Sequence, residues 1–412
     1  MSIELTSASN LAPVWSLLGS IWESYSENWF LRDCDVFSLL RRDKYPKLSI
    51  FIFDSDFCAI YHPEARNAED MARTKIVYTQ PTRDTAATPL TLSREPWASI
   101  LDPLCFVHEI DEPEYNNTVI VIPGGRYPYE GDVSEDADWL REGEAELVWR
   151  NVLVFEKLNA AGSKCNRIVK YKGRDAATAF PLLEKPRGGP LKTFLAAHRT
   201  HMYPENETGS VAPIYLPLIY RWALQILSAF SEIHRNGIIH MDIVSPDCFW
   251  LYDDLSIALV GFQSADFVNM EGERVQGDMH CGEEFRWPWV RNTRHERPTA
   301  RVDLFDWATL VYTLMTDQSP IDGMIRDIEV QEMINTGSLP ALEEEKLGYL
   351  VRKCWLGEYE SAVEVMADLK VSLTECGMEV EEDDIRGYDF GTFLKDVKGQ
   401  RQNQSQRWSV AQ

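Results

Sequence analysis

Long apolar runs are missing from this chain of 412 residues. No stretch reaches the roughly 18 consecutive apolar residues that a membrane-spanning helix needs, so the sequence predicts no membrane association. The first five residues, Met-Ser-Ile-Glu-Leu, also lack the basic region and the apolar core of a signal peptide. We therefore expect a cytoplasmic or nuclear protein.

Closely spaced cysteines are missing as well. The eight cysteines are scattered along the chain, and no pair has the spacing of a zinc site or a redox motif. Reduced thiols, most of them buried, are the expected state in a cytosolic or nuclear protein.

Positive charge is scarce. Lysine and arginine number 41 against 65 aspartates and glutamates, which gives a formal net charge of -24. Such a surface repels nucleic acid backbones and anionic lipid. The sequence therefore predicts protein partners, including ones with basic surfaces, and no nucleic acid or membrane partner. The 44% hydrophobic and 26% charged composition is that of a globular protein.

The region around residues 238–267 has the clearest pattern in the chain. Apolar residues at helical spacing predict a helix over residues 217–234, which ends near Gly237. A His-Met-Asp turn follows at residues 240–242. Two short apolar runs then flank Asp253 and Asp254, which predicts a β-hairpin.

This order of helix, His-x-Asp turn and hairpin resembles the catalytic loop of eukaryotic protein kinases. Asp242 stands at the position of the catalytic base, which accepts the proton of the substrate hydroxyl. Asp247 stands where the family has a metal-binding Asn, and its carboxylate oxygen suits a divalent metal. Gly261 begins a Gly-Phe-Gln in place of Asp-Phe-Gly and has no side chain for metal. Met241 replaces an Arg that pairs with a phosphorylated activation loop in regulated members.

The resemblance extends toward the N-terminus, where residues 104–110 are interpreted as the first strand of a small lobe. Residues 118–122 would be its central strand. Between them, residues 108–114 carry four carboxylates and a proline where the family has phosphate-binding glycines. Val121 stands at the position of the family's phosphate-binding Lys. In the predicted helix 147–158, Asn151 stands where a Glu pairs with that Lys, although a register shift to Glu146 or Glu156 is open.

Two further parts complete the resemblance. Residues 180–184 resemble the hinge strand, so Leu183 and Glu184 are the candidate nucleotide-binding residues. Asp303 begins a helix that resembles the family's αF, where a buried Asp caps the catalytic-loop backbone. Asp266 lies outside the motifs and receives no role.

Small-molecule phosphotransferases of the aminoglycoside type share the His-x-Asp turn but lack such an αF. Residues 191–195 are interpreted as a short helix after the hinge. Residues 264–298 are interpreted as the activation-segment equivalent. The last helices are predicted over residues 324–336, 347–355 and 361–373.

The resemblance implies an α+β, bilobal kinase-like fold, with a β-rich small lobe, a mostly helical large lobe and an N-terminal extension. The extension is predicted to hold helices over residues 11–25 and 33–41 and a hairpin of strands 48–53 and 57–61. Its role is open between packing on the small lobe and separate recognition. The predicted divisions are an extension over residues 1–96, a small lobe over 97–184, a large lobe over 185–375 and a disordered acidic and polar tail over 376–412.

Phosphoryl transfer requires a held triphosphate, a metal that neutralises its charge and a positioned hydroxyl. Because several groups that meet these needs are replaced, we favour a pseudokinase that acts as a binding, scaffolding or regulatory module without a cofactor. One alternative is an unusual or weakly active Ser/Thr kinase that uses ATP and Mg²⁺, with Asp242 as base and Asp247 on the metal. Another is a nucleotide-sensing kinase fold without turnover.

Overall fold

A computed structural model describes residues 49–53, 57–61, 87–88, 90–100, 105–123, 135–204, 210–242, 245–277, 297–320, 332–333, 336–388 and 393. The chain forms two compact units, Met1–Lys75 and Ile76–Gln412. In the first, β1 (Ser49–Phe53) pairs antiparallel with β2 (Phe57–Tyr61), which confirms the predicted hairpin. The predicted helices 11–25 and 33–41 lie outside the described residues. Among the described helices, none is long and apolar enough to cross a membrane.

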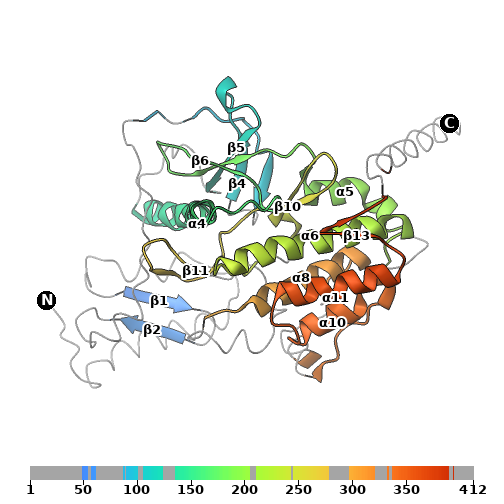
Figure 1. Cartoon of the computed structure of the whole chain (residues 1–412). Helices are drawn as coiled ribbons and strands as arrows, with labels where there is room; N and C mark the ends of the chain where they lie inside the picture. Colours follow the sequence, from blue (N-terminus) through green and yellow to red (C-terminus); the bar gives the residue numbers. More distant parts are fainter. Residues whose placement is uncertain are drawn as a thin grey trace, which may run out of the picture. The chain divides into compact units, whose positions relative to one another are not determined.

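A five-stranded antiparallel sheet and one long helix form the smaller part of the second unit (Figure 1). The central strand is buried along its whole length, because its apolar residues pack between neighbouring strands and the helix. The spatial order of the strands is β3 (Ala98–Ile100), β4 (Cys105–Glu109), β5 (Thr118–Pro123), β7 (Pro181–Glu184) and β6 (Tyr171–Arg174), and the helix is α4 (Glu135–Ala160).

The first strand of this sheet was misassigned from the sequence. β3 pairs with β4 through Ala98 and Val107, so the strand predicted over residues 104–110 is the second strand. The acidic turn 108–114 therefore joins the second and third strands, and residues 101–104 join the first and second. β3 was missed because it is only three residues long, too short for an alternating pattern to stand out.

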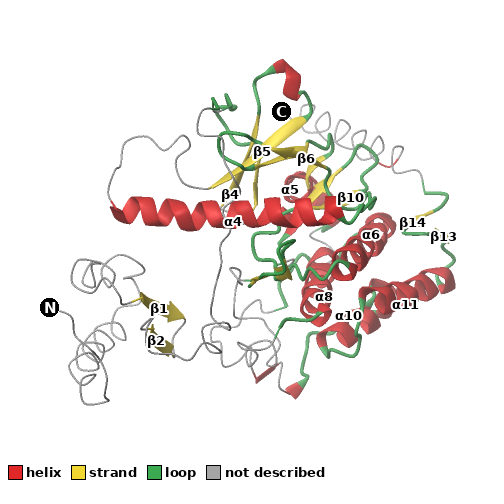
Figure 2. Ribbon diagram, turned by 60° about the vertical axis from the view of Figure 1, so that its left-hand side comes forward, coloured by secondary structure: helices red, strands yellow, loops and turns green. Residues whose placement is uncertain are grey.

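Helices form the larger part, and both views place α8, α10 and α11 below the sheet and α4 (Figures 1 and 2). The central helix is α6, which begins beside Pro217 and is followed by Gly237 at φ +67°. It packs against α8 and α11, while α10 packs on α8. These helices confirm the predicted large-lobe order. Their bounds are α5 (Leu191–Met202), α6 (Leu216–Arg235), α8 (Ala300–Thr316), α10 (Gly348–Trp355) and α11 (Ala362–Glu375).

The predicted hairpin after the His-x-Asp turn is present. β9 (Phe249–Leu251) pairs antiparallel with β10 (Ile257–Leu259), and β8 (Gly189–Pro190) extends the sheet on the other side of β9. Residues 278–296, within the segment predicted over 264–298, and most of the helix predicted over 324–336 lie outside the described residues. A short hairpin, β11 (Phe267–Val268) with β12 (Arg274–Val275), precedes the former.

The first part of the predicted tail is folded. β13 (Val380–Glu381) and β14 (Asp384–Ile385) form a hairpin, and β14 lies against α6. Asp383 makes two hydrogen bonds with Arg167 (2.7 and 2.9 Å), and Asp384 makes two with Arg221 (2.7 and 2.9 Å). Arg221 also donates to Asp254 in the β9–β10 turn. The acidic composition of this stretch suggested solvation, but its carboxylates neutralise two guanidinium groups.

We expect Asp384→Asn to lower the free energy of unfolding by about 1–2 kcal/mol, because the Arg221 side chain is 4% exposed and loses a charged acceptor. Asp384 itself is 39% exposed, so solvent screens the pair and keeps the effect below that of a fully buried pair. Urea unfolding measures the change. The control is Asp253→Asn, whose carboxylate is 68% exposed and 3.8 Å from Arg187, and which should change stability by less than about 0.5 kcal/mol. Equal effects of the two variants would contradict the expectation.

Candidate active-site cleft

Asp303 organises the His-x-Asp turn. Its fully buried carboxylate accepts hydrogen bonds from the backbone N–H groups of His240 (2.9 Å) and Met241 (2.8 Å), and it lies 2.7 Å from His234 Nε2. Met241 has φ +69°, a conformation that is strained for a residue with a side chain. Asp303 thus holds the turn in a shape that it would not keep unaided, as the family resemblance predicted.

Asp242, the candidate base, points toward the segment that follows Gly261. Its side chain is 2% exposed, and Oδ2 accepts a hydrogen bond from the Ser264 hydroxyl at 3.0 Å. Among the described residues, Oδ1 has no hydrogen-bond partner. The carboxylate is therefore already bonded to its own chain on one oxygen and withdrawn from solvent, which limits its access to a substrate hydroxyl.

Asp247, the candidate metal ligand, forms an ion pair with a lysine. Lys192, at the start of α5, places Nζ 2.9 Å from Oδ2 of Asp247, and the Ser245 hydroxyl lies 3.2 Å from the same oxygen. The Asp247 side chain is 8% exposed. A divalent cation that bound this oxygen would have to displace the Lys192 ammonium, since two cations on one carboxylate oxygen repel each other.

Gly261 is tightly enclosed. It has φ +84°, and a Cβ atom added to it would lie 2.7 Å from Cγ2 of Ile100, 3.2 Å from Oε1 of Gln263 and 3.6 Å from Sγ of Cys248. Ile100, on β3, is fully buried. The Cβ atom of a metal-binding Asp at this position would therefore collide with the Ile100 side chain unless that side chain shifted.

The backbone around Gly261 is held by α4. Asn151 Oδ1 accepts a hydrogen bond from the Phe262 backbone N–H at 2.6 Å, and Arg150 donates to the Gln263 carbonyl at 2.7 Å. Asn151 is 1% exposed. Asn151, which the resemblance matches to a Glu of the family, is a neutral amide that bonds backbone here. Val121, at the position of that Lys, is 1% exposed and pairs with Val107 across the sheet.

Aromatic side chains fill the space between the turn and the sheet. The rings of His240 and Phe262 lie 5.2 Å apart, Phe262 meets Phe155 edge to face at 5.2 Å, and Phe155 stacks on Tyr171 at 5.4 Å. Burial lowers the pKa of His240, so its ring is neutral at pH 7. This row of rings packs the large lobe against α4 and β6.

The predicted hinge offers little to a nucleotide base. Leu183 is fully buried. The backbone N–H of Glu184 donates to the Lys170 carbonyl, and that of Lys185 donates to the Asn117 carbonyl. Residue 186 is a proline and has no N–H. A flat heterocycle that seeks a donor from residues 184–186 would have to break an existing hydrogen bond.

Glycine does not occur between residues 20 and 123. Neither the connection formed by residues 101–104 nor the turn 108–114 can therefore bring a glycine backbone close to phosphates. In the second turn, Glu112 accepts a hydrogen bond from the Thr91 N–H at 2.8 Å, which lowers the pKa of Glu112. Its carboxylate has a structural contact in this loop.

Four residues that shape the cleft were not identified from the sequence: Ile100, Arg150, Lys192 and Asp266. Nothing in the local pattern marks Lys192, because its partner Asp247 is 55 residues away. Asp266 carried a usable signal, since a charged residue between Ala265 and Phe267 in an apolar stretch is either exposed or paired.

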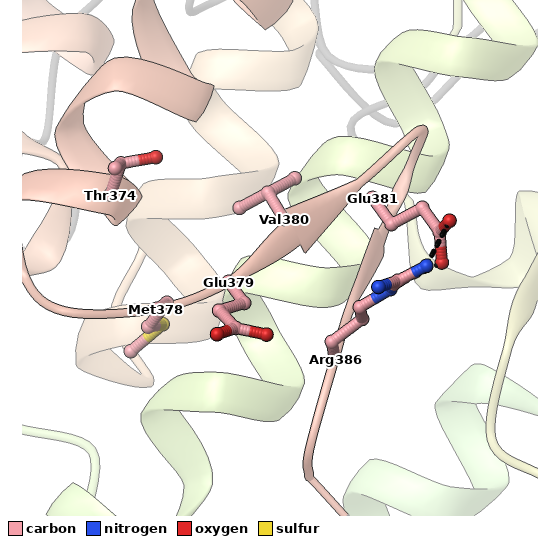
Figure 3. Close-up of a pocket in the computed structure, with 6 residues that line it drawn as sticks. All are labelled: Thr374, Met378, Glu379, Val380, Glu381 and Arg386. Carbon is pink, nitrogen blue, oxygen red and sulfur yellow. Dashed lines mark hydrogen bonds and ion pairs between the residues drawn. The ribbon is translucent and has the colours of Figure 1, made fainter.

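A surface hollow of about 460 Å³ lies elsewhere, at the end of α11 (Figure 3). In Figure 3, Arg386 points toward Glu381 across the β13–β14 hairpin, and the two side chains form an ion pair. The lining contains none of the predicted site residues, so this hollow is separate from the predicted site.

The model of the family described as "Protein tyrosine and serine/threonine kinase" matches residues 151–366, just over half of the chain. This chain belongs to the protein kinase family. It is similar to serine/threonine/tyrosine-protein kinase HT1 of Arabidopsis thaliana, with 24% identity over 140 residues, which cover 33% of this chain and 35% of that kinase. It is also similar to serine/threonine-protein kinase RAD53 of Saccharomyces cerevisiae, with 28% identity over 211 residues, which cover 48% of this chain and 23% of that kinase.

Among solved structures, the Rad53 kinase domain with SCD2 matches with a TM-score of 0.44 and 19% identity, over 67% of this chain and 86% of that one. The chain spans between 23% and 35% of the length of the two curated relatives. The helix and strand order, the Asp303 cap and the match over residues 151–366 agree on a kinase fold.

Proposed function

We propose that this kinase-family chain is a pseudokinase, which acts as a binding, scaffolding or regulatory module for protein partners. The observation that carries the proposal is the packing of Ile100 against Gly261. At this point a kinase needs an Asp that holds the metal on the phosphates. Here the position has no side chain, and an added Cβ atom would lie 2.7 Å from Cγ2 of Ile100.

The other replacements act on different steps of the same reaction. Val121 removes the cation that binds phosphate, and Lys192 occupies an oxygen of the remaining metal candidate, Asp247. Loss of one group that stabilises a transition state lowers the rate by about 10² to 10³. Even though such losses do not simply add, several together support a cleft with little phosphoryl transfer.

Two alternatives make different predictions for the same cleft. A weakly active Ser/Thr kinase would use Asp242 as base and would need Lys192 to leave Asp247 when metal binds. A nucleotide sensor would bind ATP without transfer and would need the hinge hydrogen bonds of residues 184 and 185 to open.

A thermal shift experiment on the full chain tests the proposal. We expect 1 mM ATP with Mg²⁺ or Mn²⁺ to change the melting temperature by less than about 1 °C. A ligand stabilises a protein appreciably only when its concentration is well above its Kd, and the proposal implies weak or no ATP binding. An autophosphorylation assay run in parallel should give equal background signals for the wild type, Asp242→Asn and the surface control Asp253→Asn.

A metal-dependent shift of about 5 °C or more, with activity that is lost in Asp242→Asn and kept in Asp253→Asn, would sink the pseudokinase proposal. A shift of that size without activity in any variant would favour the nucleotide sensor.

A further inference from the structure

Asp266 is a buried carboxylate that binds both ends of one segment. Its side chain is 1% exposed. Arg274 donates to Oδ2 from Nη2 (2.8 Å) and Nε (3.1 Å), and the backbone N–H of Gly277 donates to the same oxygen at 3.1 Å. Arg297 places Nε 3.5 Å from Oδ1. Because Gly277 immediately precedes residues 278–296 and Arg297 follows them, one carboxylate holds both ends of this segment.

The packing beside Asp266 leaves no room for another group. A Cβ atom on Gly277 would lie 2.3 Å from Sδ of Met241 and 2.8 Å from the Ser264 carbonyl. Met241 is 6% exposed. The Met241 thioether therefore fills the position that is cationic in regulated kinases, and it contacts the start of the segment directly. At the other end, Arg297 also donates to the Gly237 carbonyl at 3.2 Å.

We propose that Asp266 fixes both ends of residues 278–296 without phosphorylation. The family resemblance implies a switch in which an Arg at position 241 binds a phosphorylated residue of this segment. Here the signs are reversed: the fixed group is a carboxylate, and Arg274 and Arg297 supply the cations. A phosphate close to Asp266 would be repelled, since two anions a few ångströms apart in a partly buried site disfavour each other.

The composition of the segment supports this role. Residues 278–296 contain a single hydroxyl side chain, Thr293, and three arginines. Phosphorylation of Ser, Thr or Tyr within the segment is therefore limited to Thr293, and the contacts of Asp266 hold both ends without it. This conclusion holds whether or not the cleft is catalytic.

Hydrogen exchange followed by mass spectrometry tests the proposal on the full chain. We expect Asp266→Asn to speed amide exchange by about tenfold or more both in peptides covering residues 267–277 and in those covering 297–302. Thr293→Asp and Thr293→Ala should leave exchange at both ends unchanged. Asp253→Asn, which removes an exposed carboxylate, is the matched control.

Faster exchange at one end only would reduce Asp266 to a local ion pair and overturn the shared-anchor proposal. A Thr293→Asp variant that alters both ends as strongly as Asp266→Asn would restore a phosphorylation switch and also overturn it. If Asp266→Asn does not fold, Arg274→Gln and Arg297→Gln replace it, because these side chains are 38% and 47% exposed. The anchor then predicts that the double variant loosens both ends more than either single variant.

Discussion

Gly261→Asp is expected to destabilise the protein by about 4 kcal/mol or more, although it restores the family's own residue. Three effects add at this position. A side chain at φ +84° costs about 1–2 kcal/mol, overpacking against Ile100 costs about 1–3 kcal/mol, and removing the new carboxylate from water adds a further cost. The melting temperature should fall by about 10 °C, and differential scanning calorimetry measures both quantities.

Gly272→Asp is the matched control for this substitution. Gly272 has φ +83°, but nothing lies within 4 Å of an added Cβ and the residue is exposed. Gly272→Asp should therefore lower the free energy of unfolding only by the cost of a side chain at positive φ, about 1–2 kcal/mol. If Gly261→Asp instead has the melting temperature of the wild type and gains Mg²⁺-dependent binding of ATP, the site has room for a metal. The pseudokinase proposal then loses its main support.

Asp303→Asn is expected to lower the free energy of unfolding by about 3 kcal/mol. The fully buried carboxylate accepts two backbone hydrogen bonds and contacts His234, and each hydrogen bond to a charged group contributes about 1.5–3 kcal/mol. An Asn keeps one acceptor but turns its NH₂ group toward a donor. Met241, at φ +69°, then loses part of the restraint on its conformation. Chemical denaturation with far-UV circular dichroism measures the change.

Asp317→Asn, at the other end of α8, isolates the loss of charge from the loss of the cap. Asp317 pairs with Arg199 at the surface and has φ +57°, a conformation that Asn also accepts. It should change stability by less than about 0.5 kcal/mol. A change of similar size in both variants would mean that Asp303 acts through general electrostatics and not through the backbone of the turn.

The kinase fold could be predicted because its large-lobe elements are local and strongly patterned. α6 shows its period over 20 residues, and β9 and β10 flank an acidic turn. The Asp303 cap was also predictable, because it is part of the same family frame. These features depend on residue type and spacing, which a sequence displays directly.

The contents of the cleft could not be predicted in the same way. The contacts of Asp247 with Lys192, and of Phe262 with Asn151, join residues 55 and 111 positions apart. A missing Lys at Val121 shows that a group is lost, but only the structure shows what fills its place. The β3 strand is too short to show an alternating pattern. Without it, the acidic turn 108–114 is assigned to the connection between the first and second strands, whereas it joins the second and third.

The β13–β14 hairpin also has a consequence for the order of events during synthesis. Asp383 lies 216 residues after Arg167, and Asp384 lies 163 residues after Arg221. At roughly 5–20 residues per second, Arg167 is made about 10 to 40 s before its partner. Until Asp383 and Asp384 are made, the guanidinium groups of Arg167 and Arg221 lack these two carboxylates, so the residues around Arg167 and α6 are held less firmly in a nascent chain than in the finished one.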